Sequence, residues 1–312
     1  MKDRIKNILL LVGIIVFVYI VFYILNPDRF GSMSSILMLV QQSFMPSVAA
    51  CGYFFAYTIG LFDLSMGANI ILSALVGCTL SLRFGYAGLL LGCAATGVII
   101  GLVNGVVSLR LKIPAVVATV GMLIIYECFG YYITIVAGGQ NTLTLDTSLR
   151  AFGGLPWNVV LALLSFITCH ILYKYSRLGL YANAIGTNTN LAKSMGINSE
   201  KWLLIASVVG GLFVGIMSIL TISYGSTLSP ALNMESFKRG FTPIMGCFLG
   251  VAMKKYVSPI IAIILGEFLL YLLMNGLITV GIDATMQDVV EGSVLLIVVC
   301  LTMHSSRYAE VR

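Results

Sequence analysis

Long apolar runs, separated by short polar stretches, follow one another along the whole chain of 312 residues. Most of the runs come close to the roughly 20 residues with which an α-helix crosses about 30 Å of hydrocarbon. They do not alternate apolar with polar positions, which favours helices over the strands of a membrane barrel. The expected membrane segments are 8–25, 45–61, 68–82, 86–109, 115–137, 157–173, 202–223, 237–253, 257–275 and 289–303. The pattern therefore predicts an all-α polytopic membrane protein with about ten transmembrane helices.

Three stretches need a separate interpretation. Segment 68–82 is short, so we expect it to be tilted or partly re-entrant. Residues 34–42 form an amphipathic stretch, which we expect to lie in the membrane interface ahead of the second segment. The first run, 8–25, follows basic residues as in a signal peptide. It is too long for one and no small-residue cleavage site follows it, so we expect a retained first helix.

Composition supports the membrane assignment. Hydrophobic residues make up 59% of the chain and charged residues only 10%, whereas soluble domains carry about 25% charged residues. The polar loops are too short to form domains of their own. We therefore expect a single membrane domain over residues 1–312.

The basic residues predict an orientation. If the N-terminus lies in the cytoplasm, 13 of the 18 lysines and arginines fall on the cytoplasmic side of the membrane. The other five, at the opposite side, are Arg29, Arg83, Arg150, Lys238 and Arg239. Cytoplasmic connections carry the excess of positive charge, so we expect both termini in the cytoplasm. The net charge of +6 is spread singly along the chain and indicates no nucleic-acid partner.

The residue types that carry covalent chemistry form no recognisable constellation. The seven cysteines include no Cys-x-x-Cys pair, and neither His170 nor His304 has a partner at metal-ligand spacing. No phosphate-binding loop of the form Gly-x-x-x-x-Gly-Lys-Ser/Thr occurs. We expect no enzyme activity, no metal and no cofactor. Any nucleotide that drives this protein must bind to another subunit.

Three acidic residues, Asp63, Glu127 and Glu267, lie in or beside apolar runs. Such residues often mark a transport pathway or a buried pair. Asp63 lies in the stretch 60–67, Gly-Leu-Phe-Asp-Leu-Ser-Met-Gly, which predicts a helix break. Either its polar groups, Ser65 among them, cap the next helix, or Asp63 contacts the solute. Asp63, Ser65, Asn104 and Glu127 are therefore our candidates for a solute pathway or a helix break, and a structural role remains open for each.

The longest polar interruption is the stretch 175–201. Its turn-forming residues, among them Gly186 and Asn188, predict two short helices joined by a turn, with Gly196 ending the second. Arg177, Lys193 and Lys201 oppose the single acid Glu200, which places the stretch in the cytoplasm. It is either a plain connection or a docking surface for a soluble partner.

Several of these stretches together resemble the permease subunits of bacterial ABC importers for monosaccharides, the ribose/xylose/galactoside type. They are the break at 60–67, Gly-Leu-Val-Asn-Gly at 101–105 with Leu-Arg-Leu-Lys-Ile-Pro at 109–114, and 184–197 in the polar stretch. The resemblance covers about residues 30 to 300. It implies an inverted-repeat fold like that of the cobalamin importer's membrane subunit, in the bacterial cytoplasmic membrane.

The resemblance also implies partners and coupling residues. The partners are two cytoplasmic ATP-binding subunits, an extracytoplasmic sugar-binding protein, a second permease copy in a homo- or heterodimer, and membrane lipid. The residues expected to couple the chain to the ATP-binding subunit are Gly186, Asn188, Ala192, Met195, Gly196 and Ile197. Ala192 is small enough to allow close approach of a partner, so we expect it on the exposed docking surface.

The chain departs from the family pattern at 243–250, and its outer turn carries unusual charge at Glu235, Lys238 and Arg239. The solute is therefore open. We expect a passage for a ribose-like monosaccharide. The alternatives are an ABC permease for a nucleoside or a branched-chain amino acid, and an ion-coupled secondary carrier.

Overall fold

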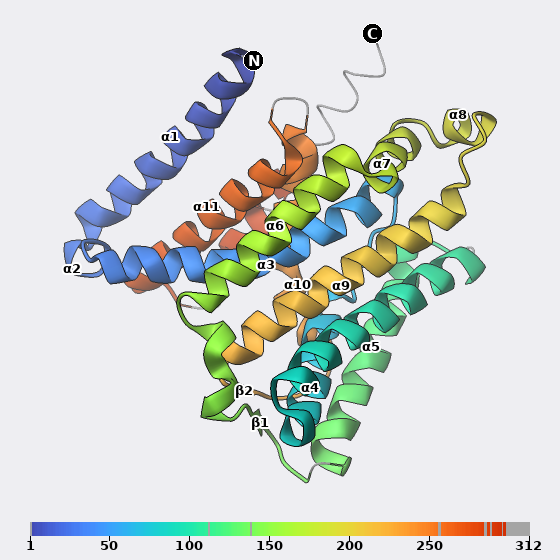
Figure 1. Cartoon of the computed structure of the whole chain (residues 1–312). Helices are drawn as coiled ribbons and strands as arrows, with labels where there is room; N and C mark the ends of the chain where they lie inside the picture. Colours follow the sequence, from blue (N-terminus) through green and yellow to red (C-terminus); the bar gives the residue numbers. More distant parts are fainter. Residues whose placement is uncertain are drawn as a thin grey trace. The chain divides into compact units, whose positions relative to one another are not determined.

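The chain is helical almost throughout in the computed structural model (Figure 1). The structure describes residues 2–111, 113–137, 139–254, 257–283, 286–287, 289–294 and 296–297. The chain divides into two compact units, one of residues 48–241 and one of residues 1–47 with 242–312. We call them the central unit and the terminal unit.

The central unit contains most of the helices. Its elements are α4 (Met66–Leu111), α5 (Ala115–Tyr131), the π-helical turn η1 (Tyr132–Ala137), β1 (Leu143–Thr144), the 3₁₀ helix η2 (Thr147–Gly153), α6 (Trp157–Tyr175), α7 (Arg177–Thr187), α8 (Thr189–Ser194), α9 (Ser199–Gly225) and β2 (Thr227–Leu228). Two further helices, α3 (Met33–Ile59) and α10 (Ser236–Met253), contribute residues to both units.

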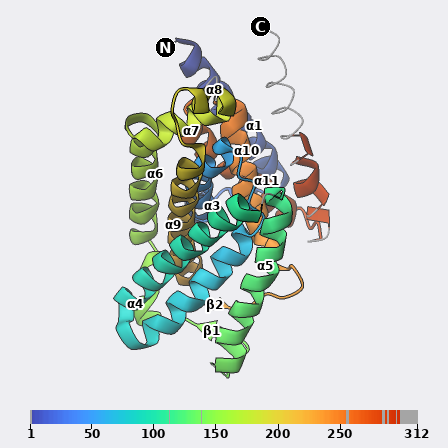
Figure 2. The ribbon, with the colours of Figure 1, turned by 90° about the vertical axis from the view of Figure 1, so that its right-hand side faces the viewer.

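Helix α4 is a hairpin of two helical arms. The backbone turns at Gly85, whose φ of 57° and ψ of −138° are outside the helical region and suit glycine. The two arms then run back alongside each other (Figure 2). A side chain at Gly77 would meet the Cys93 sulfur, and one at Gly88 would meet the Leu80 carbonyl oxygen. These small residues therefore let the arms touch.

The second arm of α4 crosses α9 at very close range. A methyl group on Gly97 would meet the carbonyl oxygen of Gly211, and one on Gly101 would meet the carbonyl oxygen of Ser207. Gly215 faces the carbonyl oxygen of Cys93 in the same way. Glycine pairs of this kind allow helix backbones to approach and pack in a membrane.

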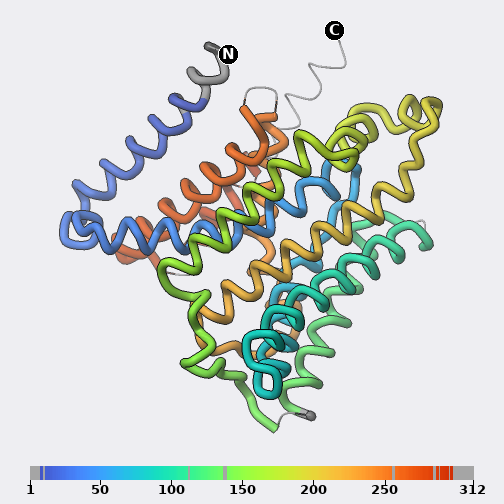
Figure 3. The backbone as a smooth tube through the Cα atoms, viewed as in Figure 1, coloured from blue at the N-terminus to red at the C-terminus, as the bar shows by residue number. Residues whose placement is uncertain are grey.

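The loops at one end of α9 are tied together by a short antiparallel ribbon. Leu143 pairs with Leu228 and Thr144 with Thr227. Both Nε and Nη2 of Arg150 donate to the Leu145 carbonyl oxygen, at 2.9 and 2.8 Å. Figure 3 follows the chain from α8 along the 27 residues of α9 to this ribbon at the other end of the central unit.

The terminal unit packs aromatic and aliphatic side chains. It contains α1 (Lys2–Leu25), α2 (Pro27–Phe30) and α11 (Pro259–Thr279), with the first part of α3 and the later part of α10. Phe22 stacks on Phe30 with ring centroids 5.8 Å apart, and both belong to a buried cluster with Leu272. Asn26 Nδ2 donates to the Thr279 carbonyl oxygen at 3.3 Å. These contacts join α1, α2 and α11.

The polytopic helical prediction is confirmed, and its details are confirmed in part. Six helices in the described part of the chain are long and apolar enough to cross a membrane. Segments 68–82 and 86–109 are the two arms of α4, and α3 joins residues 34–42 to segment 45–61 without interruption. Pro46 does not end α3. The count of ten helices stays a prediction. Much of 289–303, with His304, Cys300, Lys112, Lys255, Arg307 and Arg312, lies outside the described residues.

Candidate functional site

The predicted helix break lies at residues 60–65, between α3 and α4. Gly60 ends α3 with a φ of 109°, a left-handed value that favours glycine. Its amide donates to the Tyr57 carbonyl oxygen at 3.0 Å, and the Leu61 amide donates to that of Ala56 at 3.0 Å. These bonds satisfy carbonyl groups at the helix end. The chain is therefore free to turn before α4 begins.

Asp63 organises the break. Its Oδ1 accepts from the backbone amide of Ser65 at 2.8 Å and from the Ser65 hydroxyl at 2.7 Å. A short aspartate loop of this type imitates a backbone turn. The acceptor at the start of α4 is thus the Asp63 carboxylate, whereas the Ser65 hydroxyl donates to that carboxylate. The pattern Asp-Leu-Ser in the sequence reflects this turn.

Asn104, on the second arm of α4, joins the same group. Its Nδ2 donates to Asp63 Oδ2 and to Ser65 Oγ, each at 2.7 Å. The hydroxyl of Tyr126, on α5, donates to Asn104 Oδ1 at 2.7 Å. We call Asp63, Ser65, Asn104 and Tyr126 the Asp63 network. It ties the break to two helices that are distant in sequence, so three of the four predicted residues lie together.

Two further side chains hold the backbone of the break. The Tyr53 hydroxyl accepts from the Asp63 amide at 2.5 Å, and Thr119 Oγ1 accepts from the Leu64 amide at 3.1 Å. Sequence reasoning missed Tyr53, Thr119 and Tyr126. A weak signal existed on α5, because Thr119 and Tyr126 are seven residues apart and so share one helix face.

A cavity of about 20 Å³ touches Asp63, with Asn69, Gly101 and Ser207 among the residues that line it. A cavity of about 10–15 Å³ is already enough for one water molecule. The structure therefore describes a conformation in which no solute of sugar size fits beside Asp63.

Glu127, the fourth predicted residue, has different partners. Its side chain is only 4% exposed, and its two oxygens accept from the backbone amides of Met234 and Ser236, each at 2.9 Å. Asn233 and Met234 have left-handed φ values of 58° and 65°, which are unfavourable outside glycine. Glu127 therefore holds a strained turn at the start of α10, consistent with the structural role that the sequence left open.

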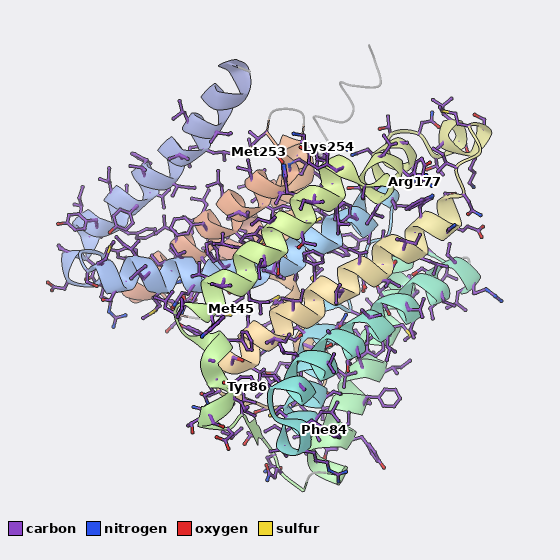
Figure 4. All side chains as sticks on the ribbon, viewed as in Figure 1. Met45, Phe84, Tyr86, Arg177, Met253 and Lys254 are labelled. Atoms are coloured by element: carbon purple, nitrogen blue, oxygen red, sulfur yellow. The ribbon has the colours of Figure 1, made fainter. Side chains whose placement is uncertain are left out.

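The polar stretch forms α7 and α8, as the two-helix prediction expected. Ser176 Oγ accepts from the Leu178 amide at 3.1 Å and caps α7, and Asn188 Oδ1 accepts from the Leu191 amide at 3.0 Å and caps α8. Gly196 ends the turn after α8 with a φ of 81°. Figure 4 labels Arg177 at the start of α7, and Phe84 and Tyr86 at the tip of the α4 hairpin, at the opposite end of the central unit.

The surface of this stretch differs from our expectation at one residue. Ala192 is 2% exposed, while Met195 is 72% and Leu191 59% exposed. The idea that Ala192 offers an open surface is therefore wrong, because α8 turns that face inward. A side chain at Gly186 would meet the Thr58 carbonyl oxygen, so Gly186 brings α7 against the end of α3. Ile197 is half-buried, and its amide donates to the Ala192 carbonyl oxygen at 3.0 Å.

Potential metal-ligating side chains do not cluster in the described part of the chain. Among the described residues, no three histidine, cysteine, aspartate or glutamate side chains gather where they could hold a metal ion. The six described cysteines are free thiols, and Cys128 is the exposed one among them.

Three relatives illustrate what the chain is similar to. It is 26% identical to the galactose/methyl galactoside import permease protein of Haemophilus influenzae over 80% of this chain and 79% of that protein. It is 29% identical to the L-arabinose transport system permease protein of Escherichia coli, over 96% of this chain and 90% of that protein. It is 22% identical to the ribose import permease protein of Escherichia coli, over 88% and 87%.

No solved structure matches the chain. The family match covers most of its length, however, and includes the Asp63 network together with α7 and α8. Residues 35–299 match the family described as the permease component of the branched-chain amino acid transport system, and the chain belongs to that family.

Proposed function

We propose that this chain is the membrane subunit of an ATP-driven importer for a monosaccharide. The observation that carries the proposal is the family match over residues 35–299, together with relatives whose names specify galactose, arabinose and ribose. The chain performs no covalent chemistry of its own. It forms the passage, and partner subunits supply the energy.

The partners follow from this role. Cytoplasmic ATP-binding subunits and an extracytoplasmic sugar-binding protein act on opposite faces of the chain, which lies in the bacterial cytoplasmic membrane. We further propose a single membrane domain of ten helices, with inverted repeats and both termini in the cytoplasm. A second permease copy, as a homo- or heterodimer, and surrounding lipid complete the assembly.

The α7–α8 stretch is the proposed contact with the ATP-binding subunit. Its exposed Leu191 and Met195 supply apolar anchors of the kind that dominate interfaces. Five other residues set the shape of the stretch. Two are the glycines Gly186 and Gly196, one is the helix cap Asn188, and two, Ala192 and Ile197, pack inward. A short stretch capped at both helices is stiff, so a force on it passes to α6 and α9.

The Asp63 network is the proposed pathway element. It links the α3–α4 break, the second arm of α4 and α5 through four polar side chains. In the described conformation these side chains satisfy one another. Rearrangement of the break would free their donors and acceptors for the hydroxyl groups of a sugar, which is the chemistry that a monosaccharide pathway requires.

Reconstitution tests the proposal. The chain is placed in proteoliposomes with the ATP-binding subunit and the binding protein encoded beside it, and uptake of labelled D-ribose, D-galactose and L-arabinose is measured. We expect uptake of at least one sugar that requires ATP and the binding protein. Uptake of leucine or uridine instead would support an amino-acid or nucleoside importer. Uptake by the chain alone under a sodium or proton gradient would overturn the proposal in favour of a secondary carrier.

A further inference from the structure

The loop between β2 and α10, residues 229–235, is fixed at both ends. Leu228 pairs with Leu143 in the ribbon. At the far end, the Glu127 carboxylate holds the amides of Met234 and Ser236. Gly67 presses against the carbonyl oxygen of Ser236, where a larger residue would not fit. The loop and the first turn of α10 therefore keep one shape, which is the condition for a preorganised binding site.

This fixed loop forms one wall of a cavity of about 340 Å³. Ile71, from the first arm of α4, contributes an apolar surface, and the loop contributes residues 229–231. Three charged side chains also line the cavity. Glu235 directly precedes α10, and Lys238 and Arg239 lie in its first part. Sites for small ligands occupy roughly 300–1,000 Å³, so this volume suits a single sugar ring.

The charged side chains that line the cavity include one, Arg239, that is open to a ligand. Two of the three charged side chains are basic, and all three are exposed to solvent. The guanidinium of Arg150, also in the central unit, donates hydrogen bonds to the Leu145 carbonyl oxygen. By contrast, within the described part of the chain no hydrogen bond or ion pair engages the guanidinium of Arg239. Its planar fork is therefore available to a ligand, and it matches a carboxylate in a bidentate contact.

We propose that this cavity binds an acidic sugar, with Arg239 recognising its carboxylate. Ile71 then faces the apolar side of the ring, and Glu235 and Ser229 accept or donate hydrogen bonds with ring hydroxyls. The inference rests on the proposed function and narrows its substrate class from monosaccharides in general to monosaccharides that carry a carboxylate. The proposed topology places the cavity at the outer end of the central unit, where an incoming solute arrives.

The test uses two sugars that differ at one position. D-galacturonate carries a carboxylate at C6 where D-galactose carries a hydroxymethyl group. Binding of each to the full-length chain in nanodiscs is measured by saturation-transfer NMR, which detects weak binding. We expect D-galacturonate to bind more tightly than D-galactose, and its affinity to fall as salt is raised, because exposed charges are screened.

Variants test whether D-galacturonate binds in this cavity. Arg239→Gln should weaken D-galacturonate binding about tenfold, since a charged hydrogen-bonded contact contributes roughly that factor. Arg239→Lys should weaken it less, because it keeps the charge and loses the fork. Arg83→Gln is the matched control, because it removes an exposed cation at the tip of the α4 hairpin that does not line this cavity, and it should leave binding unchanged.

Three results would overturn the proposal. The first is equal binding of the two sugars by the wild-type chain. The second is D-galacturonate binding that Arg239→Gln and Arg239→Lys leave intact. The third is weakened docking of the sugar-binding protein in Arg239→Gln with D-galacturonate binding unchanged, which would make the cavity a protein contact. Each variant is first shown to melt as the wild type does, and Arg239→Lys carries the test if Arg239→Gln does not fold.

The reconstitution assay keeps this inference separate from the proposed function. ATP-dependent uptake of a neutral sugar without Arg239-dependent binding of D-galacturonate would remove the acidic-sugar inference alone. Arg239-dependent binding of D-galacturonate without any ATP-dependent uptake would leave the cavity in place and remove the importer role.

Discussion

Oε1 of Glu127 accepts a 2.9 Å hydrogen bond from the backbone amide of Ser236, 109 residues further along the chain. The bond joins α5 to the first turn of α10. Anionic groups are favourable at the start of a helix, because the unpaired amides there carry partial positive charge. A buried acid in an apolar run thus has a structural explanation that needs no solute and no proton.

The first prediction concerns this bond. Glu127→Ala should lower the melting temperature in detergent, because each buried amide left without an acceptor costs about 1–3 kcal/mol. Glu127→Gln keeps one oxygen and should lose less stability. Glu200→Ala removes an exposed acid and should change stability by less than about 0.5 kcal/mol. Equal melting of Glu127→Ala and wild type would show that the bond contributes nothing.

The second prediction exchanges two side chains of the Asp63 network. Asn104→Asp alone puts two carboxylates where Asn104 Nδ2 now donates to Asp63 Oδ2, and Asp63→Asn alone puts two amides there. Each change should lower stability. The double variant restores an amide facing a carboxylate, so its loss should be smaller than the sum by about 0.5–3 kcal/mol. Melting curves of the four proteins measure this coupling, and additive losses would contradict a direct bond.

The sequence predicted the break at 60–67 well and the partners of Asp63 less well. A polar turn between two apolar runs is a local signal, so Gly60, Asp63 and Ser65 stand out. Tyr126 is different, because tyrosine is common in membrane helices and nothing local shows which way its hydroxyl points. Asn104 was found only as part of a glycine-rich motif. Contacts between distant helices depend on packing, and one sequence carries little information about packing.

For the fold too, local features were predictable from the sequence and features that depend on packing were not. Apolar length located most of the helices, because crossing a membrane imposes a length. The apolar pattern predicted residues 34–42 and 45–61 as two separate segments, whereas in the structure α3 is continuous through Pro46. The Ser43 and Ser47 hydroxyls donate to the carbonyl oxygens of Val40 and Ser43 at 2.9 and 2.7 Å, within the turns around this proline. A membrane helix can continue through a proline where its surroundings replace the lost backbone bond, and hydropathy does not predict where this happens.

The third prediction tests the crossing of α4 and α9. Gly211→Ala would press a methyl group onto the Gly97 carbonyl oxygen, and overpacking of this kind costs about 1–3 kcal/mol. Gly121→Ala is the matched control, because nothing lies within 4 Å of a methyl group there. Alanine should raise stability at that position by up to about 1 kcal/mol, through its better helix propensity. The same melting temperature in both variants would show that the close approach is not required.

The fourth prediction tests the orientation. Asn190, at the α7–α8 end, and Thr147, in the loop at the other end, are both exposed. Single cysteines are placed at these positions in a background without native cysteines, since Cys128 is exposed and would react. A membrane-impermeant maleimide added to intact cells should label position 147 and should label position 190 only after lysis. The reverse pattern would invert the proposed topology.

The last prediction separates the surface of α8 from its buried face. Met195 is 72% exposed and Ala192 is 2% exposed, so the two positions should respond differently to the same substitution. Met195→Glu puts a charge where an apolar anchor is proposed to meet the ATP-binding subunit. Truncation of such anchors commonly costs more than about 1 kcal/mol of binding, and a charge adds desolvation. We expect unchanged melting of the permease and loss of co-purifying ATP-binding subunit.

Ala192→Glu should instead destabilise the chain itself, because a buried charge without a partner is costly. Its loss of coupling should therefore come with a lower melting temperature, which Met195→Glu should not show. Thr147→Glu, an exposed change at the opposite end of α9, is the control and should leave both melting and co-purification unchanged. The measurements are pull-down of the ATP-binding subunit and ATP hydrolysis in nanodiscs. Wild-type coupling in Met195→Glu would mean that α8 is a plain connection between α7 and α9, and the contact with the ATP-binding subunit would have to lie elsewhere.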